Sequence, residues 1–166
     1  GNLCFNPISA LTRATLDVVA TDPGTRTLSR NMMLEAEKIG RRIDDLLGIE
    51  PLWGETIQGQ RYMPGQEFQP HHDWFHPGTS YWDFEMGRGG QRSFTTMAFL
   101  NEVEAGGTTD FTDIGISIEP KPGVLMIWNN ASPDGLTNPR TIHAGRPVQA
   151  GAKYVITKWY RTREWH

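Results

Sequence analysis

Cysteine is nearly absent from this sequence, because Cys4 is the only one among 166 residues. A single cysteine excludes an intrachain disulfide and a metal cluster held by several thiolates of one chain. Together with the six methionines, it favours a reducing compartment, and we expect a cytoplasmic protein. The first residue is Gly1 rather than Met, so we expect the natural N-terminus to lie further upstream.

Long apolar runs and blocks of one charge sign are also missing. The longest apolar run, residues 124–128, is far too short to span a membrane. The 16 basic and 19 acidic residues are interspersed and give a formal net charge of -3. No basic stripe predicts binding to nucleic acid, and no block of like charge predicts a disordered tail. We therefore expect neither a nucleic-acid nor a membrane partner, and the sequence leaves the oligomeric state open.

The N-terminal part of the chain contains the clearest helix. Apolar residues recur at three- and four-residue spacing over residues 33–47, and Gly48 suits the C-terminal end of such a helix. Residues 21–25 predict a turn. Residues 13–20 before it predict a strand because Val and Thr cluster there, although their periodicity fits a short helix equally well.

After Gly48, short β-type runs alternate with turns rich in Gly and Pro. Many short strands with regular turns are typical of a β-sandwich or barrel. We therefore expect one α+β domain, mainly β, in which residues 1–49 support a barrel formed by residues 50–166. The long Gly-rich loop at residues 76–91 is either a functional lid or a disordered segment. The predicted strands are residues 53–63, 67–75, 92–100, 108–111, 114–119, 123–128, 140–146 and 152–162.

Residues that can carry chemistry begin with the run PHHDWF at residues 70–75. Alternate side chains of a strand point to the same face, so His71 and Asp73 share one face and His72 points to the other. A histidine and a carboxylate at this spacing can bind one metal ion together. We therefore expect His71 and Asp73 to be metal ligands, and His72 to be structural or solvent-facing.

A 2-His-1-carboxylate metal site needs a second histidine. His143 is the best candidate because it lies in a late β-type run, which can close onto an early strand of a barrel; His76 lies in the long loop and His166 at the chain end. Lys153 begins the next β-type run, so a hairpin would bring it into the barrel interior near His143. A buried lysine needs an anionic partner, and a small dicarboxylate bound to the metal would supply it.

Four runs, taken together, resemble one known family. They are RYMPGQEFQPHHDWF, GGTTDF, PKPGVLMIWN and HAGRPVQAGAKYVITKW, in the order and spacing of the prolyl 4-hydroxylase branch of the Fe(II)/2-oxoglutarate dioxygenases. The resemblance covers about residues 50–165 and is looser over residues 1–49. It implies a double-stranded β-helix (jelly-roll) core with supporting helices. It also implies oxidative decarboxylation of 2-oxoglutarate to succinate, coupled to C–H hydroxylation, with a prolyl residue of a peptide or protein as the expected target.

The resemblance also implies roles for single residues. The three predicted metal ligands would be catalytic and hold Fe(II), and Lys153 would pair with the distal carboxylate of 2-oxoglutarate. Tyr62 matches the family tyrosine nine residues before the first ligand, and Thr109 matches the threonine of the GG-x-T motif, so both are expected to bind the cosubstrate. Gly106 and Gly107 are expected to serve a turn. O2 is the implied second cosubstrate, and ascorbate is expected as a supporting reductant.

On the substrate side, Trp159 matches the tryptophan of the terminal KW motif, and the loop residues Tyr81 and Trp82 are expected to cover a substrate. The sequence departs from the family at Arg161, where members that hydroxylate peptidyl proline commonly have a histidine. An arginine there predicts contact with an acidic group. Two alternatives stay open: hydroxylation of a free amino acid or other small molecule, and a catalytically silent jelly-roll module that binds a proline-containing peptide.

Overall fold

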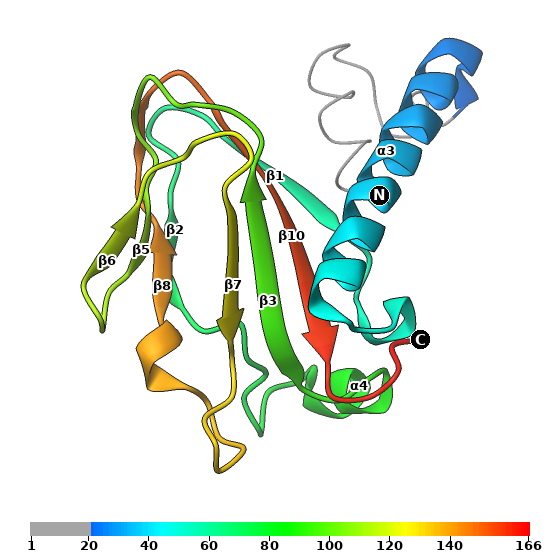
Figure 1. Ribbon diagram of the computed structural model, residues 1–166, viewed down its shortest axis with the longest axis vertical. Helices are drawn as coiled ribbons and strands as arrows, with labels where there is room; N and C mark the ends of the chain where they lie inside the picture. Colours follow the sequence, from blue (N-terminus) through cyan, green and yellow to red (C-terminus); the bar gives the residue numbers. More distant parts are fainter. Residues whose placement is uncertain (1–20) are drawn as a thin grey trace.

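The computed structural model describes residues 21–166, and two four-stranded antiparallel sheets form most of it (Figure 1). The first sheet has the strand order β1-β10-β3-β7, the second has the order β2-β8-β5-β6, and β4 pairs with β9 in a short ribbon. The strands are β1 Gln58–Tyr62, β2 Phe68–His71, β3 Arg92–Phe99, β4 Ala105–Gly106, β5 Thr109–Phe111, β6 Ile116–Ile118, β7 Leu125–Asn129, β8 His143–Gly145, β9 Val148–Ala150 and β10 Lys153–Arg161. The helices are α3 Pro23–Leu47 and α4 Trp82–Gly87, with 3-10 turns at η1 Pro51–Trp53 and η2 Pro139–Thr141.

The chain passes back and forth between the two large sheets. Strands β1, β3, β7 and β10 belong to the first sheet, and the intervening β2, β5, β6 and β8 belong to the second. This winding is that of a double-stranded β-helix. The prediction of a mainly β jelly-roll core supported by an N-terminal helix is therefore confirmed. Strands far apart in the sequence become neighbours. The last strand, β10, pairs with β1 on one side and with β3 on the other.

Apolar side chains from both sheets form the core between them. Its buried members are Phe99, Phe111, Met126, Trp128 and Val155. Phe111 from the second sheet and Trp128 from the first meet edge to face, with ring centroids 5.4 Å apart. Because aromatic rings bury large apolar areas, this contact joins the two sheets at the level of the site described below.

Helix α3 begins ten residues earlier than the periodicity predicted, so the turn expected at residues 21–25 is wrong. Asp22 is the N-cap and accepts a hydrogen bond from the Thr25 backbone N–H at 2.9 Å, and Pro23 occupies the first turn. Asp and Pro suit a turn, and they also suit the start of a helix. Gly48 ends the helix in the left-handed region at φ 64°, as expected. The strand predicted at residues 13–20 lies outside the described residues.

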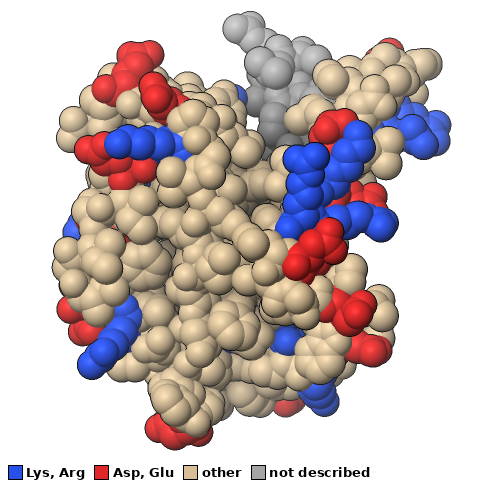
Figure 2. All heavy atoms as spheres, viewed as in Figure 1, with Lys and Arg blue, Asp and Glu red and all other residues tan. Residues whose placement is uncertain are grey.

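One face of α3 packs on the outer side of the first sheet, and the other carries charges of both signs (Figure 2). Ala36 and Ile43 are buried. Exposed ion pairs at Lys38–Glu35 and Arg41–Glu37, both 2.7 Å long, run along the outer face. No helix between residues 21 and 166 combines the length and the apolar character needed to cross a membrane.

A buried polar contact fixes α3 to strand β10. The Asp44 carboxylate accepts hydrogen bonds from Lys158 Nζ at 2.5 Å and from the Tyr160 hydroxyl at 2.6 Å. All three side chains are at least nine-tenths buried. Burial, reinforced by Asp44, raises the pKa of Tyr160, so its phenol stays protonated and donates to the carboxylate. Strand β10 is thus covered by the helix on one face and by the core on the other.

The loop at residues 76–91 is ordered, so the interpretation of a disordered segment is wrong. It contains α4, and its end is hydrogen-bonded to the C-terminal residues. The Thr162 N–H donates to the Gln91 carbonyl at 2.8 Å, and the His166 N–H donates to the Arg88 carbonyl at 3.1 Å. The C-terminal segment therefore holds this loop against the end of the first sheet (Figure 1).

We predict that Asp44→Ala lowers the free energy of unfolding by about 3–5 kcal/mol, because Lys158 would be left as a buried charge without its partner. Urea denaturation measures the loss. The double variant Asp44→Leu with Lys158→Met should recover most of it, since both charges leave together. Lys121→Ala removes only an exposed contact with Glu119 and should change stability by less than about 1 kcal/mol. An Asp44→Ala protein as stable as the Lys121 variant would contradict the role of this contact.

Candidate metal centre and adjoining cavity

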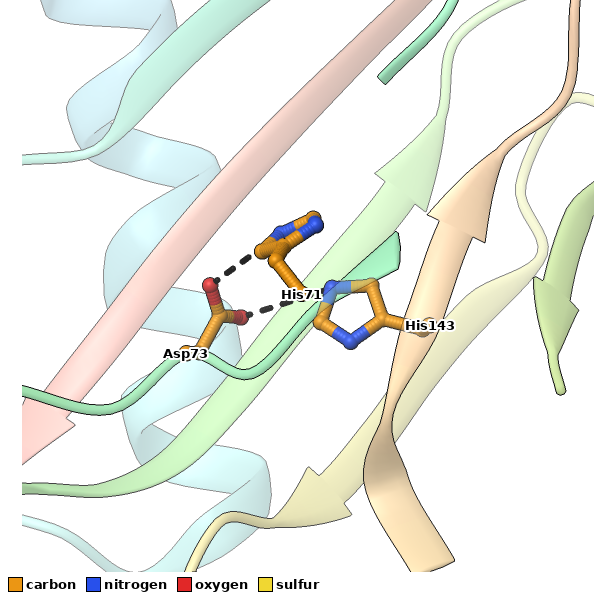
Figure 3. A group of neighbouring side chains, drawn as sticks. All are labelled: His71, Asp73 and His143. Carbon is orange, nitrogen blue, oxygen red and sulfur yellow. Dashed lines mark ion pairs between the residues drawn. The ribbon is translucent and has the colours of Figure 1, made fainter. Parts of the chain in front are cut away.

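Three potential metal ligands converge where strands β2 and β8 pair (Figure 3). His71 ends β2 and faces His143, the first residue of β8, in the strand register. The Asp73 carboxylate lies to one side of both rings, with Oδ1 3.7 Å from His71 Nε2 and Oδ2 3.8 Å from His143 Nε2. Both separations are too long for hydrogen bonds, so the three side chains do not satisfy one another. Among the described residues, this is the one group of three His, Cys, Asp or Glu side chains close enough to share a metal ion.

The local backbone structure that places Asp73 here differs from the predicted one. The strand expected at residues 67–75 ends at His71, and Asp73 lies in a bend after it. Strand alternation therefore does not explain why His71 and Asp73 share a side. His72 also borders the cavity beside the ligands, and its Nδ1 is buried without a hydrogen-bond partner among residues 21–166. The strand alternation from which we expected His72 to point to the opposite face is therefore absent at this position.

Backbone carbonyls orient both imidazole rings. His71 Nδ1 lies 2.8 Å from the Gln69 carbonyl oxygen, and His143 Nδ1 lies 2.9 Å from the Thr141 carbonyl oxygen. A carbonyl only accepts, so each Nδ1 carries a proton and each Nε2 is turned toward Asp73. Burial lowers the pKa of His143, which favours its neutral form. Two imidazoles oriented in this way and one carboxylate fit the donor set of an Fe(II) site.

A cavity of about 360 Å³ extends from these ligands to Lys153. Lys153 is 3% exposed, and its Nζ donates a hydrogen bond to Thr109 Oγ1 at 3.0 Å. The ammonium lies 5.6 Å from the centre of the Tyr62 ring. None of the ion pairs between residues 21 and 166 includes Lys153, and burial lowers its pKa to about 8. The far end of the cavity therefore holds a cation that lacks a carboxylate partner.

The turn beside Lys153 requires its two glycines. Gly106 and Gly107 both have φ 74°, in the left-handed region that favours glycine. A Cβ on Gly106 would lie 2.5 Å from the Pro147 carbonyl oxygen. The prediction that these glycines serve the turn is confirmed, and the turn lets Thr109 follow at the start of β5.

The predicted substrate residues occupy three different environments. Trp159 lines the cavity and is buried, and its indole Nε1 has no hydrogen-bond partner among residues 21–166. Tyr81 is exposed and meets Phe75 edge to face, with ring centroids 6.0 Å apart. Trp82 begins α4 and is half-buried. Neither Tyr81 nor Trp82 is among the residues that line the cavity.

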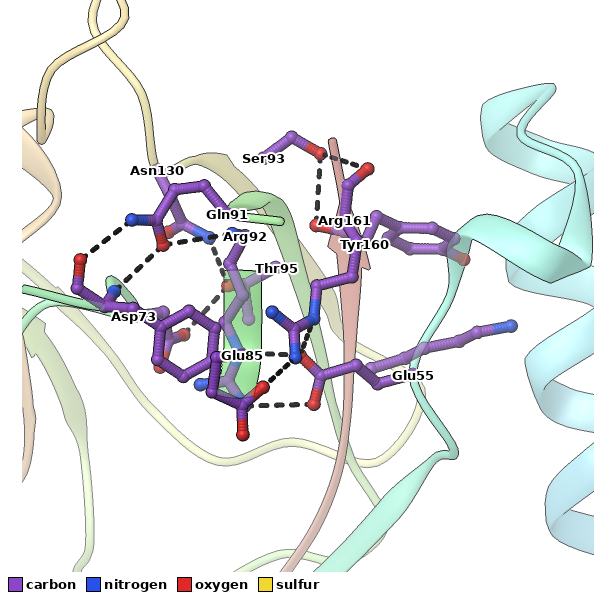
Figure 4. Close-up of polar contacts among 12 residues, drawn as sticks. Glu55, Asp73, Glu85, Gln91, Arg92, Ser93, Thr95, Asn130, Tyr160 and Arg161 are labelled. Carbon is purple, nitrogen blue, oxygen red and sulfur yellow. Dashed lines mark hydrogen bonds and ion pairs between the residues drawn. The ribbon is translucent and has the colours of Figure 1, made fainter. Parts of the chain in front are cut away.

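Arg161 contacts acidic groups, as its charge predicted, but these belong to the protein itself (Figure 4). Its guanidinium pairs with Glu55 at 2.7 Å, pairs with Glu85 of α4, and donates to the Gly90 carbonyl at 2.5 Å. The side chain is 1% exposed and does not line the cavity. In this structure Arg161 holds α4 and the end of the loop, and its charge is already matched.

Sequence reasoning missed Arg92, which lines the cavity beside Trp159. Its guanidinium carbon lies 4.0 Å from the centre of the Trp159 ring, and Glu55 accepts two hydrogen bonds from it at 2.8 and 3.0 Å. Gln58 and Gln60 of β1 also line the cavity. The period of two along β1 could have found them, because they share a face with Tyr62. No local signal singles out Arg92.

A larger cavity, of about 690 Å³, lies between α3 and residues 51–57. Arg30, Met33 and Asp44 of the helix and Lys158 of β10 are among its lining residues. It contains none of the residues predicted to carry chemistry and adjoins the helix-facing side of β10. The smaller cavity is therefore the candidate active site, since it contains the clustered ligands and Lys153.

Comparison with known families gives one match over most of the chain. The model of the 2OG-Fe(II) oxygenase superfamily matches residues 57–161, which include the three clustered ligands and Lys153. A second model, of the ketopantoate reductase PanE/ApbA C-terminal domain, matches residues 1–77, less than half of the chain. The overlapping strands β1 and β2 pair with β10 and β8, which lie within the first match. The described part of this region is therefore continuous with the jelly roll.

Curated relatives are similar over part of their own length. Probable prolyl 4-hydroxylase 8 of Arabidopsis thaliana is 32% identical over 167 residues, which cover 89% of this chain and 56% of that protein. Prolyl 4-hydroxylase subunit alpha-1 of Gallus gallus is 35% identical over 126 residues, which cover 76% of this chain and 24% of that subunit. The chain thus spans about half of the first relative and about a quarter of the second.

Solved structures show the same similarity in three dimensions. The viral collagen prolyl hydroxylase of Paramecium Bursaria Chlorella virus-1, in a truncated form, is 29% identical with a TM-score of 0.62 over 76% of this chain and 68% of that chain. The same enzyme in complex with 2OG is 28% identical with a TM-score of 0.60, over 78% and 71% of the two chains.

We predict that His71→Ala, Asp73→Ala and His143→Ala each weaken binding of Mn(II) by at least about 100-fold, because each removes one of three ligands. Isothermal titration calorimetry measures the affinity, and circular dichroism checks the fold. His72→Ala should stay within about threefold of the unsubstituted protein, since His72 lies beside the ligand group without joining it. A His72 variant that loses as much affinity as His71→Ala would show that the ligand set is misassigned.

Proposed function

Because the chain belongs to the 2OG-Fe(II) oxygenase superfamily, we propose that it is a prolyl hydroxylase that uses Fe(II) and 2-oxoglutarate. One observation carries the proposal: a 2-His-1-carboxylate group and an unpaired lysine border the same cavity. A metal chelated at one end and a carboxylate bound at the other would satisfy both. The similarity to prolyl 4-hydroxylases, and to a collagen prolyl hydroxylase solved with 2OG, supports this reaction class.

The donor set fits ferrous iron, so His71, Asp73 and His143 would hold it. With 2-oxoglutarate and O2, bound Fe(II) supplies the oxidising power for C–H hydroxylation, while 2-oxoglutarate is converted to succinate and carbon dioxide. The protein positions its ligands through the Gln69 and Thr141 carbonyls. Ascorbate would act as a reductant that keeps iron ferrous, and a reducing cytoplasm would do the same.

Lys153 would bind the distal carboxylate of 2-oxoglutarate. The ammonium is held by Thr109 and lies beside the ring of Tyr62, in a wall that excludes most water. A charge-assisted hydrogen bond in such a setting is stronger than one in water. Thr109 fixes the direction of the ammonium, and Tyr62 limits the space around the carboxylate. Together these three residues set the length of the dicarboxylate that the cavity accepts.

The substrate would approach beside Trp159 and Arg92. The Trp159 side chain lines the cavity wall, while its indole N–H is buried without a hydrogen-bond partner among residues 21–166. Tyr81 and Trp82 lie on the loop that Arg161 holds through Glu85, where they would cover a bound chain. We infer that Arg161 shapes this cover rather than contacting the substrate, because Glu55 and Glu85 already match its charge.

Succinate formation with candidate substrates tests the function. The protein is incubated with Fe(II), 2-oxoglutarate, ascorbate and oxygen, together with a proline-rich peptide, free proline or no substrate. The expected result is succinate in stoichiometric yield with peptide that gains the mass of one oxygen atom. Hydroxylation of free proline instead would support the small-molecule alternative. Peptide binding without succinate, in protein shown to bind iron, would overturn the enzyme proposal in favour of a silent binding module.

The pKa of Lys153, about 8 in the free protein, predicts how cosubstrate affinity depends on pH. The ammonium form pairs with the carboxylate, so affinity should be constant below about pH 8. Above it, binding must bring in a proton, and affinity should fall by about tenfold per pH unit. Titration of Mn(II)-loaded protein with 2-oxoglutarate from about pH 7 to about pH 9 measures this. Lys153→Arg should remove the dependence, since arginine stays charged. Equal slopes for both proteins would contradict the assignment.

A further inference from the structure

Two buried residues outside the ligand group form a hydrogen-bond chain that ends on Asp73 (Figure 4). Thr95 Oγ1 donates to Asp73 Oδ2 at 2.8 Å, and Asn130 Nδ2 donates to Thr95 Oγ1 at 2.8 Å. Thr95 is fully buried and Asn130 is 2% exposed. The chain joins three segments, because Asn130 follows β7, Thr95 lies in the middle of β3 and Asp73 follows β2. Neither Thr95 nor Asn130 lines the cavity.

The chemistry of the two donors fixes the direction of the two hydrogen bonds. A hydroxyl group has a single proton, and the NH2 group of a side-chain amide only donates. Since Asn130 donates to Thr95 Oγ1, the proton of that hydroxyl is left for Asp73. The two bonds then polarise each other in a buried environment, which strengthens the contact at the carboxylate.

This contact distinguishes the two oxygens of Asp73. Oδ2 accepts the bond from Thr95, whereas Oδ1 accepts no hydrogen bond from residues 21–166 and lies 3.7 Å from His71 Nε2. A carboxylate anchored through one oxygen cannot turn freely about its own axis. Both oxygens face a histidine, since Oδ2 also lies 3.8 Å from His143 Nε2, but only Oδ1 has all of its lone pairs free for a metal ion.

The geometry points to Thr95 and Asn130 as positioning residues that hold Asp73 as a single-oxygen metal ligand. The inference rests on the proposed metal centre and adds two residues to it. Without the hydroxyl, Oδ2 would be buried and unpaired. The carboxylate would then turn, or offer both oxygens to the metal, and the open positions expected of a 2-His-1-carboxylate site would change.

The test compares Thr95→Val with a matched control on the same strand. Thr95→Val keeps the shape and removes the hydroxyl, and we expect its Mn(II) dissociation constant to rise by about 10- to 100-fold. Thr96 is equally buried and also donates a hydrogen bond, but to the Lys158 carbonyl at 3.2 Å. Thr96→Val should bind Mn(II) within about threefold of the unsubstituted protein. Thr95→Ser restores the hydroxyl and should recover most of the affinity.

A second readout separates positioning from stability. The visible spectrum of the Co(II)-loaded protein reports the number and arrangement of ligands, which a general loss of stability does not change. We expect the spectrum to change in Thr95→Val and to stay the same in Thr96→Val. Unchanged Mn(II) affinity and Co(II) spectrum in Thr95→Val, or equal losses in both valine variants, would overturn the inference. If the unsubstituted protein binds neither metal, the proposed metal centre itself fails.

Asn130→Asp provides a test that does not depend on the folding of Thr95→Val. An ionised aspartate at this position only accepts hydrogen bonds, so the Thr95 hydroxyl would donate to it and would turn an oxygen lone pair toward Asp73. We expect a loss of Mn(II) affinity at least as large as that of Thr95→Val, whereas Asn130→Gln can still donate and should lose less. Affinity equal to that of the unsubstituted protein in Asn130→Asp would overturn the proposed direction of the chain.

Discussion

Burial of strand β10 on both faces is the constraint on which the rest of the structure depends. Lys153, Val155, Thr157 and Trp159 alternate along its inner face and line the cavity. Ile156, Lys158 and Tyr160, which alternate with them, are buried as well, and the last two contact Asp44 of α3. Two polar groups on the helix side are paired with a carboxylate, whereas Lys153 on the cavity side is not. The same strand thus stabilises the fold through one face and presents unsatisfied polar groups through the other.

Closure of the second sheet determines where the candidate metal ligands meet. His71 and His143 are 72 positions apart in the sequence but opposite each other in the register of β2 and β8. The end of β2 at His71 then frees the backbone to bend, which places the Asp73 carboxylate beside both rings. Thr95 contacts Asp73 from the other sheet. The ligand group therefore lies where the two sheets approach each other and has support from both.

Much of this could be predicted from the sequence, for reasons that differ from residue to residue. Periodicity identified the second half of α3, and the regular turns identified the jelly roll. The candidate ligands His71, Asp73 and His143 could be chosen because few residue types bind metal ions and the barrel brings early and late strands together. The start of α3 was missed because Asp22 and Pro23 suit a turn as well as a helix. The position of Asp73 was right for the wrong reason, since a bend rather than a strand places it.

What could not be predicted depends on pairing between distant residues. Arg161 looked free to meet a substrate, but Glu55 and Glu85 take up its charge, and nothing near Arg161 in the sequence indicates this. Arg92 and Thr95 are likewise defined by what they contact, Glu55 and Asp73, not by a motif. Sequence patterns identify groups that need a partner. Which partner they find depends on the tertiary fold, since Glu55, Glu85 and Asp73 all lie outside the strands.

The charges of the cavity residues match the combined charge of the proposed Fe(II) and 2-oxoglutarate. Asp73 brings a carboxylate and Lys153 an ammonium group to the cavity, both side chains are buried, and burial lowers the pKa of His143, which favours its neutral form. Fe(II) alone would leave two excess positive charges in a poorly hydrated space, and 2-oxoglutarate alone would leave two excess negative charges. Fe(II) and 2-oxoglutarate bound together would leave no excess charge. Since uncompensated charge is costly in such an environment, each should favour the binding of the other. A site built for a metal alone would have no need of Lys153, and a site for a dicarboxylate alone would have no need of Asp73.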